Sequence, residues 1–172
     1  INNDNRRDGI VLKTNAEGDI LWSQIYGGSQ DDFIQSGIST SDGGYLFAGR
    51  TFSFGAGEAD GFLVKMDSSG NILWSQTYGE SDDETINSVY ETQDGGYVFT
   101  GFKRGGANNT WVVKVDASGN EEWNKRFNGN SGRSIIETDD GGIVIGGSTS
   151  AIGAGGFDMF LIKVDSQGNR IF

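Results

Sequence analysis

Cysteine, histidine and proline are all absent from this chain of 172 residues. Without cysteine there is no disulfide, no thiolate nucleophile and no cysteine-ligated metal. Without histidine the chain lacks the commonest general base and the usual ligand of transition metals. Average usage of ~5% would give about nine prolines, and proline is one of the residues that blunt exposed strand edges. No G-x-S-x-G elbow or phosphate-binding loop offsets these absences, so we predict that the protein is not an enzyme and needs no cofactor.

Positive charge is also scarce. The chain has 13 Lys and Arg against 24 Asp and Glu, which gives a net charge of −11. Such a chain repels phosphate backbones and anionic membranes, so nucleic acid is excluded as a partner. No run approaches 18 apolar residues, so no membrane span is predicted.

What the chain does contain is one pattern repeated about every 50 residues. With spacings of 52, 49 and 49 residues, a lysine after a hydrophobic run recurs at Lys13, Lys65, Lys114 and Lys163. Nine positions after each lysine stands an aromatic residue, at Trp22, Trp74, Trp123 and Phe172. A period of this length indicates one supersecondary unit that is copied and stacked.

Each unit divides into four short stretches bounded by turn signals. In the second copy, residues 85–92 (TINSVYET) precede Asp94-Gly95-Gly96, and residues 97–102 (YVFTGF) follow it. Asp followed by two glycines predicts a tight hairpin turn, because glycine supplies the positive φ angles. The third and fourth stretches, taken from the preceding copy, are residues 62–67 and 72–78. Nothing has a 3.6-residue apolar period, so almost no helix is expected.

Four short antiparallel strands per unit, apolar on both faces, predict a blade of a β-propeller. The predicted fold class is all-β: a small propeller of four blades, one of them incomplete, with four antiparallel strands per blade. A single domain spans residues 1–172, with a partial blade at 8–27 and blades at 33–78, 85–127 and 133–172. The layer between blades is expected to be filled by aromatic residues such as Trp74, Tyr78, Tyr97 and Phe99.

The unit can be written "GG…DD…I..T.DGGY…G.T.S.G.G..D.FLVK.D..GN..W". The matching residues include Asp31-Asp32, Asp42-Gly43-Gly44, Phe62-Leu63-Val64-Lys65, Gly70-Asn71 and Trp74. This pattern resembles the secreted β-propeller repeats of bacteria and archaea, and the LVKMDSSGNILW stretch is similar in layout to PQQ-type propeller blades. The resemblance implies strands that run from the propeller axis outward, and a location outside the cell or on its surface.

The count of strands leaves one blade without its two inner strands. Either the molecule continues beyond this sequence, or the fourth blade is thin, or a strand from another chain completes it. An unpaired strand edge is a template for pairing with another molecule, and head-to-tail contacts that do not close produce a fibre or tube. We therefore predict a structural or interaction module that self-assembles, as a homo-oligomer or filament, through the incomplete blade. The alternative is a lectin-like propeller that binds a glycan or surface partner through an acidic loop face with Phe52 and Phe54.

Several residues are candidates for local chemistry. The carboxylates Asp31, Asp32, Asp82 and Asp83 stand in loops before first strands. These loops are expected to lie on the same propeller face as the second-to-third-strand loop that holds Glu58 and Asp60. Oxygen ligands of this kind suit Ca²⁺, but the spacing matches no EF-hand loop, and solvated loops are the favoured interpretation. Asn108 begins an N-x-T sequon that could carry a glycan in a secreted protein. The repeated lysines are expected to pair within their own sheets, and Asp67, Asp116, Asp165 and Asn15 to hold the tight turns.

Overall fold

The protein is described by a computed structural model, which covers residues 6–106, 109–150 and 155–172. This part of the chain contains strands and no helix, so the all-β prediction is confirmed. It therefore holds no helix that is long and apolar enough to cross a membrane. The strands form four antiparallel sheets, numbered here 1 to 4 in chain order.

Two of the sheets have all four predicted strands, in sequence order. Sheet 2 consists of β3 (Asp32–Ser39), β4 (Tyr45–Thr51), β5 (Asp60–Met66) and β6 (Ile72–Tyr78). Sheet 3 consists of β7 (Glu84–Glu91), β8 (Tyr97–Lys103), β9 (Thr110–Val115) and β10 (Glu121–Phe127).

The two end sheets are smaller. Sheet 1 consists only of β1 (Gly9–Thr14) and β2 (Ile20–Tyr26), which correspond to third and fourth strands. Among the described residues, no strand pairs with the other edge of β1. Sheet 4 consists of β11 (Ser131–Glu137), β12 (Ile143–Thr149) and β13 (Asp158–Val164). The predicted fourth strand of this sheet is not formed within the described residues. In its place Arg170 makes an isolated bridge to Val164, and the amide of Ile171 donates a hydrogen bond of 2.8 Å to the carbonyl of Lys163.

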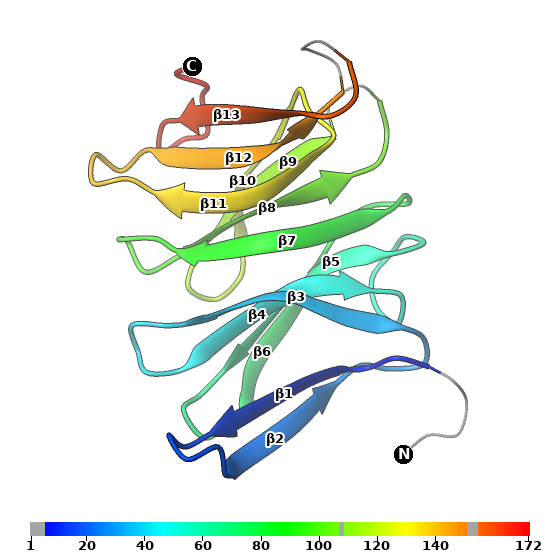
Figure 1. Ribbon diagram of the computed structural model, residues 1–172, viewed down its shortest axis with the longest axis vertical. Coiled ribbons are helices and arrows are strands. Elements are labelled where there is room, and N and C mark those ends of the chain that lie inside the picture. Colours follow the sequence, from blue (N-terminus) through cyan, green and yellow to red (C-terminus); the bar gives the residue numbers. More distant parts are fainter. Residues whose placement is uncertain (1–5, 107–108, 151–154) are drawn as a thin grey trace.

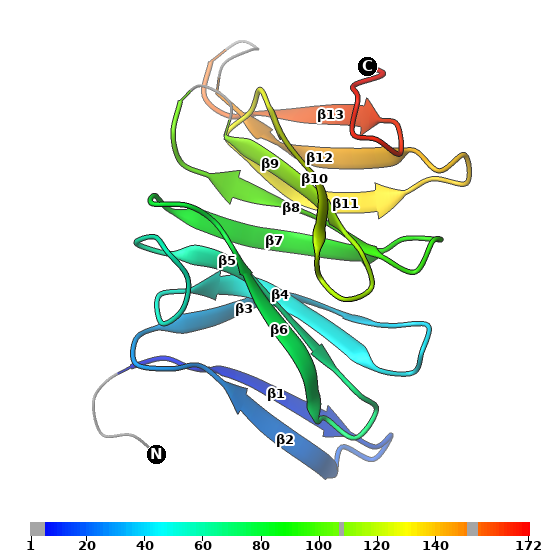
Figure 2. The ribbon, with the colours of Figure 1, turned by 180° about the vertical axis from the view of Figure 1, so that it is seen from behind.

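The sheets are stacked in chain order, so sheets 1 and 4 lie at opposite ends of the molecule (Figure 1). The first strands β3, β7 and β11 are neighbours along one side of the stack. The fourth strands β6 and β10 lie on the other side, as the reverse view shows (Figure 2).

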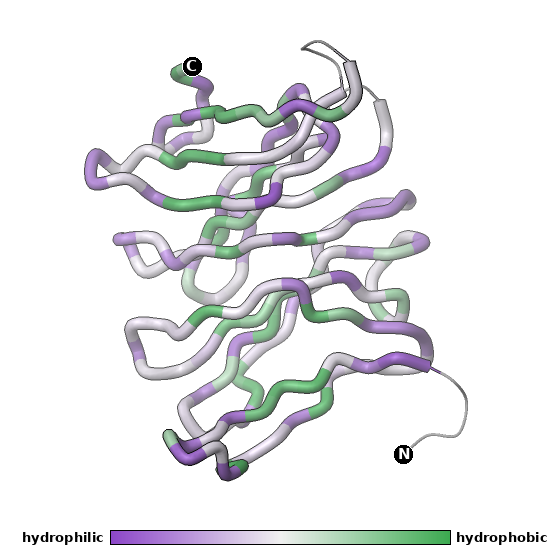
Figure 3. The backbone as a smooth tube through the Cα atoms, viewed as in Figure 1, coloured by the Kyte–Doolittle hydropathy of each residue, from purple (hydrophilic) through white to green (hydrophobic). Residues whose placement is uncertain are grey.

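Three apolar layers hold the stack together. Every residue of β5 is buried, because alternate side chains point to opposite faces and both faces are covered. Phe62 and Val64 face sheet 1, where the ring of Tyr26 stacks on Phe62 at 4.9 Å. Leu63 points the other way and packs with Trp111 of sheet 3. The third layer joins sheets 3 and 4 through Val98, Val112, Ile135, Ile143, Ile145, Ile162 and Val164. Figure 3 accordingly shows hydrophobic segments on strands through the whole stack and hydrophilic segments at the turns.

The aromatic residues occupy the layers as predicted. Tyr97 and Phe99 are buried between sheets 2 and 3, with Tyr78 beside them and Trp74 packed at the margin. The rings of Tyr78 and Phe99 are 5.0 Å apart and tilted by 59°, an arrangement that favours contact between ring edge and face. These aromatics are therefore core residues and not a ligand platform.

The tight turns between third and fourth strands follow one scheme, which confirms the predicted role of their Asx residues. Oδ1 of Asp67 accepts hydrogen bonds from the amides of Ser69 (2.8 Å) and Asn71 (2.9 Å). Gly70 adopts φ 84°, a left-handed conformation that favours glycine. Equivalent bonds form at Asn15, Asp116 and Asp165.

The burial pattern predicts different costs for the same substitution at two equivalent leucines. Leu63 is 0% exposed, whereas Leu161, at the same position of sheet 4, is 67% exposed. Leu63→Ala should lower the free energy of unfolding by about 2–5 kcal/mol, because it leaves a cavity. Leu161→Ala should change it by about 0.5 kcal/mol or less. Urea denaturation in dilute solution measures both values, and equal costs would contradict the assignment of the layers.

Candidate interaction surfaces

Each complete hairpin is tied to its third strand by a lysine and an aspartate. Nζ of Lys65 lies 2.8 Å from Oδ2 of Asp42, and Nζ of Lys114 lies 2.6 Å from Oδ2 of Asp94. Lys163 pairs with Asp140 in the same way. The prediction that each repeated lysine finds a partner in its own sheet is confirmed for these three.

Lys13 is the exception, because sheet 1 has no Asp-Gly-Gly turn. Its Nζ lies 3.5 Å from the carbonyl oxygen of Ser68 and 5.5 Å from the ring centroid of Tyr45, both in sheet 2. In the other sheets a carboxylate of the same sheet binds the lysine ammonium. In sheet 1 the ammonium of Lys13 is instead contacted by a carbonyl and a ring of sheet 2.

The aspartates of these ties have depressed pKa values. Burial raises the pKa of Asp94, but hydrogen bonds from Lys114, Thr92 and the amide of Gly96 outweigh it and lower the pKa to about 2. The hydrogen bond from Lys65 holds the pKa of Asp42 well below its usual range. Burial lowers the pKa of Lys114, but Asp94 and Glu122 together outweigh that effect and raise it.

The candidate calcium ligands do not converge. Asp32 is buried, and its Oδ2 accepts hydrogen bonds from the amide of Gly28 (2.9 Å) and the hydroxyl of Ser53 (2.6 Å). Oδ1 of its neighbour Asp31 accepts from the amide of Arg7 at 2.9 Å. Asp82 is exposed. Within the described residues, no three acidic side chains come together in a way that could hold a metal ion.

The loop carboxylates at sheets 2 and 3 are largely paired with basic residues. Asp83 contacts Arg50 (2.9 Å) and Arg104 (2.5 Å), and Arg104 also lies 3.7 Å from Glu58. Lys103 lies 2.8 Å from Glu80 and 3.8 Å from Glu84. Burial raises the pKa of Glu84. The sequence did not reveal these pairs, because Arg50 and Asp83 are far apart in the chain.

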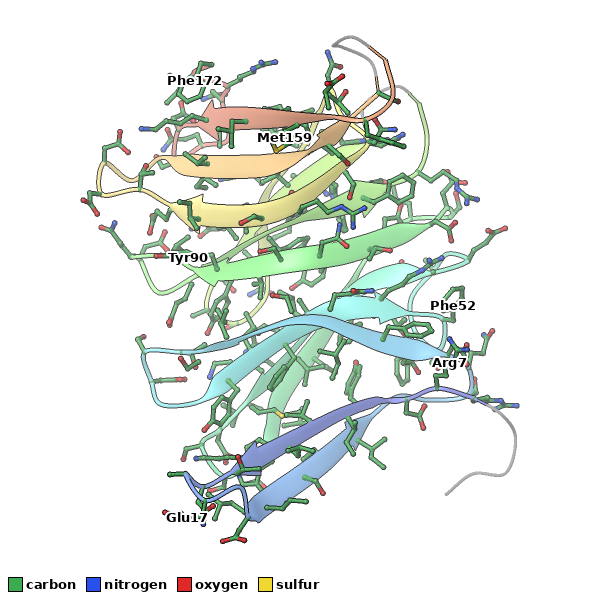
Figure 4. The ribbon with its side chains drawn as sticks, viewed as in Figure 1. Arg7, Glu17, Phe52, Tyr90, Met159 and Phe172 are labelled. Carbon is green, nitrogen blue, oxygen red and sulfur yellow. The ribbon has the colours of Figure 1, made fainter. Side chains whose placement is uncertain are left out.

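A hollow of about 420 Å³ lies at the rim of sheets 1 and 2, lined by Arg6, Ser29, Gln30, Asp31 and Phe52. Figure 4 shows Phe52 and Arg7 at this rim. The guanidinium of Arg50 lies 4.5 Å from the centroid of the Phe52 ring. Phe54 is 43% exposed and its ring lies 5.9 Å from that of Tyr26. The two aromatics proposed for ligand binding thus also pack against their neighbours. The sequon residue Asn108 lies outside the described residues.

The free face of sheet 1 is apolar and exposed. Ile10 is 62% exposed and Leu12 is 51% exposed, whereas the equivalent residues Phe62 and Val64 of sheet 2 are 0% and 1% exposed. The sequence pointed to unpaired strand edges, and this face was not predicted. Counting from the repeated lysine would have found it, because residues at equal distance from the lysine point to the same side.

The free face of sheet 4, at the opposite end, is also apolar. Met159 is 92% exposed and Leu161 is 67% exposed. A hollow of about 680 Å³ opens beside them, with Gly146 and Gly147 in its lining. Figure 4 shows Met159 and Phe172 at this end of the molecule. Both end faces therefore present exposed apolar side chains.

Comparison with known proteins supports the fold alone. No family model matches the chain, and no curated protein matches it in sequence. The crystal structure of a protein of unknown function from Bacteroides caccae is similar, with a TM-score of 0.58 and 10% identity. The match covers 96% of this chain and 57% of that protein. The chain therefore spans little more than half the length of this similar structure.

The Lys–Asp ties predict an acid-labile contribution to stability. The pKa of Asp94 is depressed to about 2, so its contribution is present above the unfolded pKa of about 3.9 and is lost as the pH falls towards about 2. Asp94→Asn should lower the melting temperature at pH 7 and flatten its decline over that range. Melting curves between pH 7 and pH 2 measure this.

The matched control is Asp139→Asn, which removes an exposed carboxylate from the equivalent turn of sheet 4. This variant should keep the acid decline of the wild type. An Asp94→Asn variant with an unchanged decline would rule out a stabilising role for the tie.

Proposed function

We propose that this protein is a non-catalytic β-propeller module with a structural or interaction role outside the cell, and that it self-assembles through its ends. The propeller architecture is supported by the repeated four-stranded sheets and by first strands that line one side of the stack. Sheets 1 and 4 lie at opposite ends (Figure 1), so the ring is not closed within the described residues. The extracellular location rests on the resemblance to secreted repeats.

The single observation that carries the self-assembly is the pair of apolar end faces. Four large side chains, Ile10, Leu12, Met159 and Leu161, are each more than half exposed. Burying one such side chain contributes about 1.5–3 kcal/mol. Exposed apolar surface of this kind marks sites of protein–protein contact, and Ile10 and Leu12 stand at the positions that Phe62 and Val64 occupy in a buried layer.

A lectin-like function is the second candidate. It is favoured by the rim hollow, in which Arg6, Gln30, Asp31 and Phe52 bring charged, amide and aromatic groups together. Convergent polar groups beside an aromatic ring are typical of a small-molecule site. A glycan array separates the two functions, because a lectin should give a discrete signal as a monomer.

Sedimentation velocity over a concentration series tests the self-assembly. The 18.4 kDa chain should give larger species as the concentration rises. Added salt should not weaken the association, because apolar contacts are not screened. A single 18.4 kDa species up to high concentration would overturn the proposal.

A further inference from the structure

We infer that the free face of sheet 4 binds the free face of sheet 1 of a second copy, in the register that joins consecutive sheets within one chain. This inference rests on the proposed self-assembly. It adds which surface is the partner, the head-to-tail direction of the contact and its register. The template is the sheet-to-sheet contact that occurs three times inside the molecule.

The first part of the template is a tryptophan that covers a glycine of the next sheet. Trp22 of sheet 1 lies over Gly70 of sheet 2, so closely that a Cβ on that glycine would stand 2.8 Å from the indole. The same contact joins Trp74 to Gly119 and Trp123 to Gly168, at 3.1 Å and 3.0 Å. Two of the indoles also donate hydrogen bonds to carbonyls of these turns, from Trp22 to Ser68 (3.3 Å) and from Trp123 to Ser166 (2.9 Å).

The fourth instance of this contact has both halves but no partner. Gly18 occupies the turn of sheet 1 with φ 92°, and nothing lies within 4 Å of the position where its Cβ would be. Phe172 occupies the tryptophan position of sheet 4 and is 60% exposed. It is held beside β13 by the hydrogen bond from the amide of Lys163 to its carbonyl (3.2 Å).

The two halves cannot meet within one molecule. Phe172 and Glu17, the neighbour of Gly18, are labelled at opposite ends of the stack in Figure 4. A second copy brings them together without any change of fold.

The second part of the template is the third strand. Between sheets 2 and 3, Trp111 and Val113 pack onto Ala48 and Leu63, and Trp111 also lies 3.2 Å from the Cβ position of Gly61. The residues of sheet 1 at the positions of Trp111 and Val113 are Ile10 and Leu12.

The corresponding surface of sheet 4 is open. The positions of Ala48, Leu63 and Gly61 are taken there by Gly146, Leu161 and Met159, which line the hollow of about 680 Å³. Ile10 and Leu12 of a second copy are the side chains that the repeat would bring onto this hollow. The interface continues an arrangement already present in the chain, which favours a second copy over an unrelated partner.

The proposed contact is heterologous (head-to-tail), because it joins two different faces. Each copy can then bind one neighbour at each end, and the assembly either closes into a ring or grows as a fibre. Among the described residues sheet 1 has two strands, whereas sheets 2 and 3 have four each. The contact that these residues can make is therefore smaller than the one between sheets 2 and 3, and we expect weaker association than a permanent interface gives.

Two complementary variants test the direction of the contact. Leu161→Asp blocks the face of sheet 4, and Ile10→Asp blocks the face of sheet 1. Both residues are exposed, so both variants should fold, which circular dichroism and melting verify. Each variant alone should associate at least ~10-fold more weakly than the wild type, because a carboxylate resists burial in an apolar contact.

An equimolar mixture of the two variants should form a species of about twice the 18.4 kDa chain mass and grow no further. The intact face of sheet 1 in one variant then binds the intact face of sheet 4 in the other. The matched control is Leu73→Asp, which alters a leucine of sheet 2 that is 57% exposed but lies on neither end face. It should assemble as the wild type does.

The outcomes separate the two proposals. A wild type that stays monomeric overturns the self-assembly and this inference with it. A wild type that assembles while Ile10→Asp alone still dimerises, or while the mixture forms no dimer, overturns only the head-to-tail contact.

Cross-linking tests the register. The chain has no cysteine of its own, so Glu17→Cys and Phe172→Cys in one chain introduce the only thiols. Mild oxidation should produce a ladder of disulfide-linked copies. The control pair Ser81→Cys with Phe172→Cys should give none above the background of random collision. Equal ladders from both pairs would overturn the proposed register.

Discussion

The structure depends on the fact that a sheet of this repeat is apolar on both faces. A sheet with one apolar face needs one neighbour, whereas this one needs two. In β5 the alternation of side chains sends Phe62 to one layer and Leu63 to the other, and both are completely buried. The stack satisfies this requirement for sheets 2 and 3. It leaves sheets 1 and 4 with one face each that the same chemistry would bury.

The polar residues solve a different problem, which is how to hold the edges of each sheet without polar groups in the layers. The Lys–Asp ties and Asx turns lie at one rim, where Lys65 is buried but its partner Asp42 remains in contact with water. The arginine and lysine pairs with Asp83 and Glu80 lie in the loops at the other ends of the strands. Charged residues therefore surround the apolar layers. The chain has a net charge of −11, yet in the part that the structure describes no three acidic side chains gather into a site for a metal ion.

Much of the fold could be predicted from the sequence, because its information is local and repeated. The strand at Ile72–Tyr78, the Asx turns and the lysine partners all lie within one unit, where alternation and glycine placement specify them. The contacts that the sequence did not predict are those between different units. Trp22 covers Gly70 in the next sheet, and Asp83 pairs with Arg50 across two sheets. Such contacts depend on how the copies are rotated relative to each other, which the period alone does not specify. The same limit explains why the open strand edge was considered and the exposed face was not.

Among the described residues, the strands that pack against a different sheet do so against a neighbouring one. This has a consequence for how the chain can change in length. An insertion of one whole unit after β6, for example, would meet on both sides the surfaces that β6 and β7 already present. A loss of one residue within a strand would instead turn the following side chains of that strand to the wrong face. Chain length should therefore vary between relatives in steps of about one repeat, because a whole sheet can be inserted between two others but part of a strand cannot be removed.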